Sequence, residues 1–303
     1  MLDASPQPSL QPPLETFPEN AAPTDRTWHG HLDLEFSHRP GETILSRSLV
    51  KAPLKVQRPF YPEGKVVCHS IMLHTAGGVV GGDRLSSHIQ LQPQAQALLT
   101  TAAATKIYGD KGIPASQTIH IQVGAGASIE WLPQETIVFD GALYHQSLKV
   151  ELAEGARWLG WDILRLGRSA RGERFSKGEW RSHTEIWQQG RLIWVDPQWL
   201  QGGDDMLESG HGLAGCPVIG SLAFVGEEVS EEFIVSIRNL LDIDSVSVSS
   251  PAQIAVSRLM SGFLCRYRGH STSECRQKMI QVWQRVRQVY GERSLCLPRV
   301  WQR

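Results

Sequence analysis

The chain has 303 residues and a formal net charge of −1, with 30 basic and 31 acidic side chains. Because phosphate binding requires a concentrated basic surface, this balance argues against nucleic acid as the main partner. The five cysteines are widely spaced and odd in number, which indicates reduced thiols of a cytosolic protein rather than a disulfide framework. No apolar run approaches the roughly 20 residues that cross a bilayer, and the amino terminus lacks the layout of a signal peptide. We therefore expect a cytoplasmic protein with no membrane partner.

Residues 1–27 form a proline-rich leader with few large apolar side chains. Such a segment cannot bury enough surface to fold, so we expect it to be disordered. Residues 28–303 are expected to form a single, mainly β domain. This domain begins with a strand over residues 28–36, whose hairpin partner covers residues 43–51, followed by an irregular proline-containing connection over residues 53–64.

Three segments, 89–97, 119–127 and 148–156, resemble one another and recur at intervals of 30 and 29 residues. Each alternates apolar with polar side chains, crosses a turn of small residues that ends in alanine, and continues as a second apolar run. Alternation of period two predicts strands with one buried face, and turn residues between two such runs predict hairpins. A fixed interval of this length is typical of stacked units that share one core.

The predicted strands of these repeats have two distinct faces. One face of the first strands should be buried, and it carries Ile89, Leu91, Ile119, Ile121, Val123, Leu148, Val150 and Leu152. The opposite face carries Gln90, Gln122, Lys149 and Glu151. The second strands alternate more weakly, which indicates that they are covered on both faces: 98–102, 129–132 and 158–163. The expected fold is mainly β, with repetitive stacked β-hairpins in two sheet layers, resembling a β-helix; a parallel coil and a layered antiparallel stack both fit.

Two helices are expected in the carboxyl-terminal third, over residues 230–241 and 272–290. Ser230 is a cap for the first, and a capping box from Ser271 to Glu274 opens the second, which ends at Gly291. The other elements expected after the repeats are a hairpin over residues 183–194, a long glycine-rich loop over 201–220, and strands over 245–249 and 254–260.

The glycine cluster at residues 77–82, followed by Asp83, invites a nucleotide-binding interpretation. Its spacing fits neither a phosphate loop nor a dinucleotide fingerprint, because no Lys-Ser/Thr pair follows and no helix-forming run begins after Gly82. We favour a tight turn between strands, in which glycine tolerates positive φ angles. A helix directly after Gly82 would support the nucleotide alternative, and a strand there would exclude it.

Candidate ligands and acid–base groups are few. His211 and Cys216 share the glycine-rich loop and are a weak candidate for a transient soft-metal site. Glu135 and Asp140 could be a catalytic carboxylate pair, although both also fit turn-capping roles. No Gly-x-Ser-x-Gly elbow is present, and the ten tryptophans follow the strands, so core packing explains them better than a stacking platform.

Four segments together resemble the urease accessory protein UreD (UreH) family: residues 74–83 (HTAGGVVGGD), 100–108 (TTAAATKIY), 131–140 (WLPQETIVFD) and 166–173 (LGRSARGE). Residues 298–301 (PRVW) are similar to the ending of that family, and the order agrees from about Trp28 to Trp301. Ala103 is a minor departure, because a bulkier or amide residue is expected there. The leader lies outside the resemblance.

The resemblance implies a non-enzymatic scaffold with no tightly bound cofactor. Members of this family bind the urease apoprotein and the accessory protein UreF, which recruits the GTPase UreG. GTP hydrolysis by that partner drives nickel delivery into the urease active site, which holds a carbamylated lysine. The family is also thought to pass nickel in transit through an internal, water-filled path.

Asp83, Glu135 and Asp140 are the carboxylates inside the matching segments, so we expect them on or near this nickel path. Carboxylate oxygens and water can hold Ni²⁺ loosely, without the affinity of a thiolate or imidazole cluster. Two alternatives remain open from the residues alone. One is a carbohydrate-active hydrolase or lyase that uses Glu135 and Asp140, and the other is a nucleotide-binding enzyme that uses residues 77–82.

Overall fold

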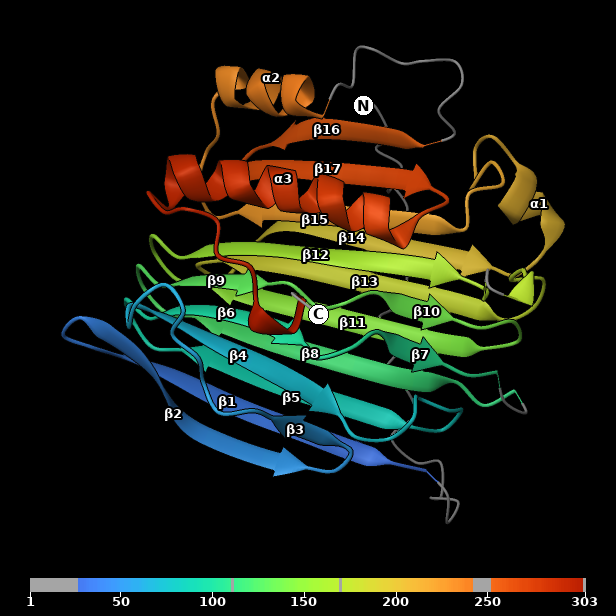
Figure 1. Ribbon diagram of the computed structural model, residues 1–303, viewed down its shortest axis with the longest axis horizontal. Coiled ribbons are helices and arrows are strands. Elements are labelled where there is room, and N and C mark those ends of the chain that lie inside the picture. The colour runs from blue at the N-terminus through green and yellow to red at the C-terminus, as the bar shows by residue number, and fades with distance from the viewer. Residues whose placement is uncertain (1–26, 110–111, 169–170, 242–251, 302–303) are drawn as a thin grey trace, which may run out of the picture.

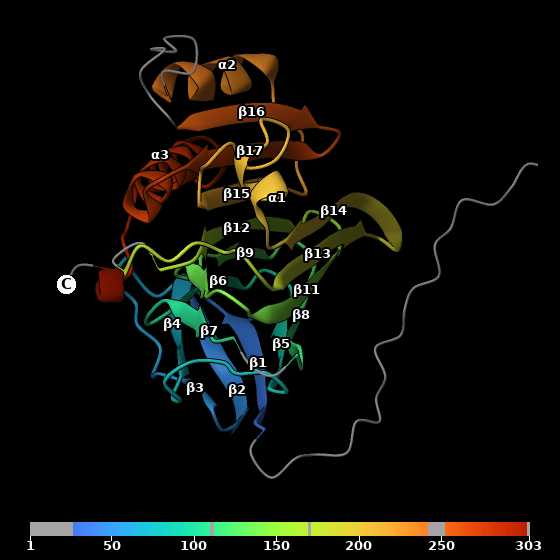
Figure 2. The same ribbon diagram turned by 90° about the vertical axis from the view of Figure 1, so that its right-hand side faces the viewer.

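In the computed structural model, two β-sheets lie face to face, and helices cover the outer side of one sheet (Figures 1 and 2). The structure describes residues 27–109, 112–168, 171–241 and 252–301. The leader therefore lies outside the described residues except for Thr27, and so does the strand predicted over residues 245–249.

Sheet A, the seven-stranded sheet, consists of β1 (His29–Arg39), β2 (Glu42–Lys51), β5 (Arg84–Leu91), β8 (Ala115–Val123), β11 (Leu143–Leu152), β13 (Glu179–Gln188) and β14 (Arg191–Gln201). Its order in space is β14–β13–β11–β8–β5–β1–β2. Neighbours among β1, β5, β8, β11 and β13 are parallel, whereas β2 and β14 close the two edges as antiparallel hairpin partners. The hairpins predicted at 28–51 and 183–194 are thus confirmed.

Sheet B has ten strands: β3 (Leu54–Val56), β4 (Val67–His74), β6 (Gln96–Thr101), β7 (Thr105–Ile107), β9 (Ser128–Trp131), β10 (Thr136–Val138), β12 (Arg157–Leu166), β15 (Val218–Val225), β16 (Gln253–Leu259) and β17 (Gly262–Gly269). Its main path is β16–β17–β15–β12–β9–β6–β4–β3, and β7 and β10 extend it beside β12. β4, β6, β9 and β12 are parallel neighbours. The strand β16 confirms the one predicted over residues 254–260, whereas β17 was not predicted.

The repeats form a parallel coil, which confirms a mainly β, β-helix-like fold in two layers. Each repeat contributes its first strand to sheet A and its second strand to sheet B, as β5 and β6 show. The two strands of one repeat therefore face each other and do not pair as a hairpin, which corrects that detail of the prediction. Ladder partners come instead from the next coil, because this stacking buries the apolar face of every strand between the sheets.

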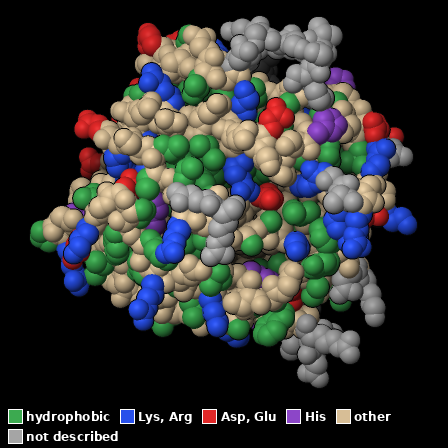
Figure 3. Space-filling model, viewed as in Figure 1, with side chains coloured by type: hydrophobic (Ala, Val, Ile, Leu, Met, Phe, Trp, Pro, Cys, Tyr) green, Lys and Arg blue, Asp and Glu red, His purple; other side chains and the backbone are tan. Residues whose placement is uncertain are grey.

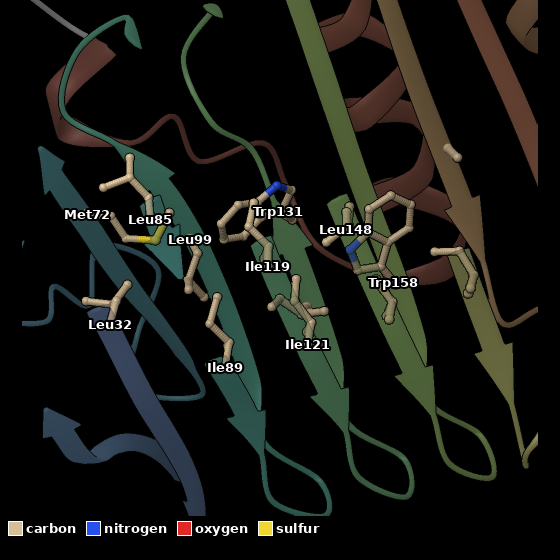
Figure 4. Packing of buried hydrophobic residues seen from close by; sticks show 14 of the residues in the cluster. Leu32, Met72, Leu85, Ile89, Leu99, Ile119, Ile121, Trp131, Leu148 and Trp158 are labelled. Atoms are coloured by element: carbon tan, nitrogen blue, oxygen red, sulfur yellow. The ribbon is translucent and has the colours of Figure 1, made fainter. Parts of the chain in front are cut away.

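The space between the sheets holds the apolar side chains that the alternation predicts. In sheet A, Ile89 lies directly opposite Ile121, which lies opposite Val150, and all three are fully buried. Figure 4 shows Ile89 beside Leu99 of the facing sheet, and Ile121 belongs to the same cluster. The polar partners of these residues, such as Gln122, lie on the outer face and remain partly exposed. The predicted division of each strand into two faces is therefore confirmed.

Sheet B is covered on both sides, as the weak alternation of its strands indicates. Its outer face packs against α2 (Glu231–Leu240) and α3 (Thr272–Tyr290), which form a second apolar cluster with β12, β15 and β17. A short helix, α1 (Asp204–Glu208), and the start of β15 lie inside the stretch predicted as one loop over 201–220, which corrects that prediction. A 3₁₀ turn, η2 (Arg299–Trp301), ends the described chain on the outer side of sheet B (Figure 1).

The caps of both long helices agree with the sequence signals. The Ser230 hydroxyl accepts a hydrogen bond from the backbone N–H of Phe233, and the Ser271 hydroxyl accepts one from Glu274. The carboxylate of Glu274 accepts instead from the Tyr267 hydroxyl at 3.1 Å, which ties the start of α3 to β17. Within the described residues, no helix combines the length and apolar character needed to cross a membrane.

Candidate functional site

The glycine cluster is a turn between strands, with Asp83 as its clamp. Gly82 has a φ of 89°, and β5 begins at Arg84, where a nucleotide site would need a helix. The carboxylate of Asp83 is fully buried and accepts hydrogen bonds from the backbone N–H groups of Trp28 at 2.8 Å and Val80 at 3.0 Å. The nucleotide-binding alternative is therefore excluded.

The other two motif carboxylates also have structural partners. Glu135 forms an ion pair with Arg276 of α3, which attaches that helix to the loop before β10. Asp140 accepts hydrogen bonds from the backbone N–H groups of Ser176 at 2.7 Å and Lys177 at 2.8 Å. With their oxygens engaged in this way, Glu135 and Asp140 do not form a free catalytic pair. Whether any of the three motif carboxylates lies on a nickel path stays a prediction that these contacts do not favour.

Cys216 contacts His270, whereas the sequence analysis pairs it with His211. Its thiol lies 3.7 Å from Nε2 of His270, at the end of β17, and burial raises the pKa of the thiol. His211 is exposed, and its backbone N–H donates to the hydroxyl of Ser209 at 3.2 Å. A metal site at His211 and Cys216 remains untested.

A cavity of about 220 Å³ lies between the two sheets. Both sheets contribute polar side chains to its lining: Gln146 and Ser182 come from sheet A, and Asp162 and Ser221 come from sheet B. The space is large enough for several water molecules, which need polar partners. Figure 3 shows the surface that carries sheet B, where a hollow with histidine atoms at its edge opens near the centre of the view.

Two carboxylates give the cavity its polar end. Asp162, on β12, accepts a hydrogen bond from the side-chain amide of Gln146 at 2.9 Å. Asp196, on β14, is buried and accepts from Gln198 at 2.8 Å and from the guanidinium of Arg266 at 2.5 Å. Burial, together with the negative charge of Asp196, raises the pKa of Asp162 to about 6. Asp196 is therefore paired with a cation, whereas Asp162 forms no ion pair among the described residues.

Two further polar atoms support a hydrated cavity. Nε2 of His74 and Nε1 of Trp158 are buried, border the cavity, and have no hydrogen-bond partner within the described part of the chain. Buried polar atoms are nearly always satisfied by protein or by ordered water. Because the space beside these atoms admits water, we infer that water or a hydrated ion supplies their missing partners.

Replacing Asp162 with asparagine is expected to stabilise the fold at about pH 8 by about 1–3 kcal/mol, with little effect at about pH 4. The folded chain raises the pKa of Asp162 from 3.8 to about 6. The stabilisation of the fold by protonated Asp162 is therefore complete below the unfolded pKa of 3.8, and it is lost as the pH rises through the folded pKa of about 6. Urea denaturation at both pH values tests this, and a variant that is less stable than wild type at pH 8 would contradict it.

A second polar cluster lies on the outer side of sheet B. Arg287 of α3 bridges Glu130 of β9 and Glu63, and Glu63 also contacts His69 at 2.6 Å. Glu63, His69 and Cys296 place potential ligand atoms within 4.8 Å of one another, the only such trio in the described ranges. Because Arg287 already holds both oxygens of Glu63, we interpret this cluster as a structural ion-pair network rather than a metal centre.

Sequence reasoning missed both clusters. The signal for the cavity was present: Gln146, Asp162, Ser182 and Asp196 are polar residues at inward positions of alternating strands. Nothing local signals the second cluster, because Arg287 and Glu130 are 157 residues apart in the sequence.

Comparison with known proteins identifies the family. A model of the UreD urease accessory protein family matches residues 29–302. The urease accessory protein UreD of Nostoc punctiforme is 58% identical over 275 residues, covering 91% of this chain and 96% of the relative. Those of Acaryochloris marina (52% over 275 residues, 91% of this chain and 95% of the relative) and Methylobacillus flagellatus (40% over 283 residues, 93% and 97%) are also similar. The chain therefore belongs to the UreD family of urease accessory proteins.

Proposed function

We propose that this chain is a nickel-insertion chaperone for urease, and that Ni²⁺ passes through the cavity between its two sheets. Membership of an accessory-protein family supports a role in urease maturation and is consistent with a protein that is not an enzyme. The single observation that carries the cavity as the path is the pair of carboxylates, Asp162 and Asp196, that line a space large enough for water.

The chemistry of the cavity suits transit better than storage. Carboxylate, amide and water oxygens bind Ni²⁺ more weakly than thiolates and imidazoles do. Asp162, Asp196 and Gln146 supply such oxygens, and the described residues that line the cavity include no cysteine and a single histidine, His74, so they do not form a cluster of strong ligands. A conduit needs this weak binding, because an ion held by a strong ligand set would not move on to the urease apoprotein.

We expect a partner protein, and not this chain, to hydrolyse the nucleotide that drives nickel delivery. The glycine cluster of this chain joins two strands and has no nucleotide-binding geometry. We propose that the chain binds the urease apoprotein in the cytoplasm, contacts UreF, and through UreF engages the GTPase UreG, whose GTP hydrolysis drives nickel delivery. Nickel is the cargo, and the chain itself needs no tightly bound cofactor.

Replacing Asp162 with alanine is expected to lower the nickel loaded per urease active site several-fold when nickel is limiting. The reason is that the variant removes the cavity carboxylate that has no basic partner in the ion pairs described above. Urease apoprotein is matured with purified chain, UreF, UreG and GTP, and its nickel is measured by mass spectrometry. Asp33→Ala is the matched control, because Asp33 is a carboxylate on the outer face of sheet A. Wild-type loading by Asp162→Ala, with urease binding intact, would refute the proposed path.

The same assay decides the carboxylates chosen from the sequence. Asp83, Glu135 and Asp140 are each changed to alanine, and binding to urease is confirmed before nickel is measured. Each change is expected to weaken the fold locally, since each carboxylate holds a turn or a helix. Unchanged nickel loading would remove that residue from the path.

A further inference from the structure

Arg266 lies at the end of a polar row that crosses three strands of sheet B. Asp162 on β12 is directly opposite Ser221 on β15, and Ser221 is directly opposite Arg266 on β17. Residues that are directly opposite in a ladder share one face of the sheet. The Arg266 side chain therefore leaves the sheet on the same side as Asp162, toward the space between the sheets.

The guanidinium of Arg266 links the two sheets at this end of the cavity. It donates to Asp196 of sheet A at 2.5 Å and to the hydroxyl of Ser221 of sheet B at 2.7 Å. Asp196 and Ser221 both line the cavity, whereas the Arg266 side chain is 38% exposed to solvent. The cation thus stands between the cavity and the solvent, in contact with the walls of both sheets.

Of the two cavity carboxylates near Arg266, only one is paired with a cation. Asp196 is neutralised by Arg266, but the only side-chain hydrogen bond described for Asp162 comes from the neutral amide of Gln146. Both carboxylates line the same cavity, and the Gln198 amide, which donates to Asp196 at 2.8 Å, also donates at 3.5 Å to the hydroxyl of Ser221, the residue directly opposite Asp162. A divalent cation beside both carboxylates would satisfy this pair better than the single charge of Arg266 does.

We propose that Arg266 closes the cavity at the β14–β17 end, and that an entering divalent cation opens it by replacing the guanidinium beside Asp196. A partly exposed Arg–carboxylate pair contributes little to stability, so a cation can displace it readily. The opposite end has no such closure in the described lining: Ala103 borders the cavity and is exposed. That the natural cation is Ni²⁺ rests on the proposed function, whereas the closure rests on the contacts of Arg266.

Arg266→Gln is expected to bind Ni²⁺ about tenfold more tightly than wild type, because no guanidinium competes for Asp196. The full-length chain is titrated with NiCl₂ alone by isothermal titration calorimetry, with thermal unfolding as the test of folding. The gain should disappear in the double variant Arg266→Gln, Asp196→Asn. If the glutamine variant does not fold, Arg266→Lys should give a smaller gain, since an ammonium group lacks the fork that spans Asp196 and Ser221.

Arg47→Gln is the matched control. Arg47 pairs with Asp33 and Glu35 on the outer face of sheet A and is 44% exposed, similar to Arg266. Its removal frees carboxylates that are not among the described residues lining the cavity between the sheets, and the affinity for Ni²⁺ should stay that of wild type. An Arg266→Gln affinity equal to or below that of wild type, or a gain that persists without Asp196, would overturn the closure.

The outcome separates this inference from the proposed function, because the titration contains neither urease nor the other accessory proteins. An unchanged affinity in Arg266→Gln, together with reduced loading by Asp162→Ala, would overturn the closure and leave the nickel path in place. A tenfold gain in affinity, together with normal loading by Asp162→Ala, would keep the cation-dependent closure and refute the path to urease.

Discussion

Replacing Arg287 with alanine is expected to destabilise the chain by about 3–5 kcal/mol, the largest effect we expect from a single ion-pair residue. The Arg287 side chain is 1% exposed and donates to both oxygens of Glu130, at 2.8 and 2.6 Å, and to Glu63 at 2.8 Å. Trp283 donates to the same Glu130 carboxylate at 2.9 Å. The alanine variant would leave two carboxylates without their cation, and the free energy of unfolding from urea denaturation measures the loss.

This effect should depend on pH in a definite direction. Burial would raise the pKa of Glu63, but hydrogen bonds and charge from His69 and Arg287 outweigh it and lower the pKa to about 2. A lowered carboxyl pKa means that its stabilisation is present above the unfolded value of 4.5 and is lost as the pH falls toward 2. The difference between wild type and Arg287→Ala should therefore shrink in acid.

Gln288→Ala is a suitable control for this experiment, since Gln288 is the exposed neighbour of Arg287 on α3. Its effect should stay within about 0.5 kcal/mol. If Arg287→Ala also stayed within that range, the cluster would not be what fixes α3 to sheet B.

The second large effect is expected from Ser182→Phe, which should reduce nickel loading to that of a reaction without the chain while the fold is retained. Ser182 lies directly opposite Gln146 on one neighbouring strand and Gln198 on the other, and all three line the cavity. A phenyl ring at this position would occupy the polar end of the space. Because the ring enters an existing cavity, the cost in stability should not exceed the usual 1–3 kcal/mol or so of an overpacked core.

The matched control for Ser182→Phe is Ser147→Phe. Ser147 is on β11 of the same sheet but faces outward, one residue from Gln146. Both variants add the same apolar ring to sheet A, and only one adds it to the cavity. A general effect of the ring on solubility or on urease binding would appear in both variants, whereas an effect on transit would appear only in Ser182→Phe.

The sequence allowed the strands and their faces to be predicted, but not the partner of each strand. Alternation places Ile121 and Val150 inside because a period of two sets which side of a strand is apolar. It does not say whether the next strand along the chain pairs beside the first or faces it across a core. The turn between β5 and β6 directs the chain to the other sheet, and this depends on stacking against the neighbouring coils rather than on local residues.

The site was harder to predict than the fold, for a physical reason. The carboxylates in the most recognisable segments, Asp83 and Asp140, border tight turns, where their oxygens cap backbone N–H groups. The carboxylates in the cavity stand alone within apolar strands, as Asp162 does between Trp161 and Ile163. The available signal was a polar residue at an inward position of an alternating strand. This signal indicates a polar cavity only once two such strands are known to face each other.

The most direct test of nickel transit between the sheets is the nickel bound per active site of urease after maturation with Ser182→Phe, compared with wild type and Ser147→Phe. Urease apoprotein, UreF, UreG and GTP are held constant, and binding of each variant to urease is verified in the same samples. Transit through the cavity predicts that Ser182→Phe loads no more nickel than a reaction without the chain, while Ser147→Phe matches wild type. Wild-type loading by Ser182→Phe in an intact complex would contradict it.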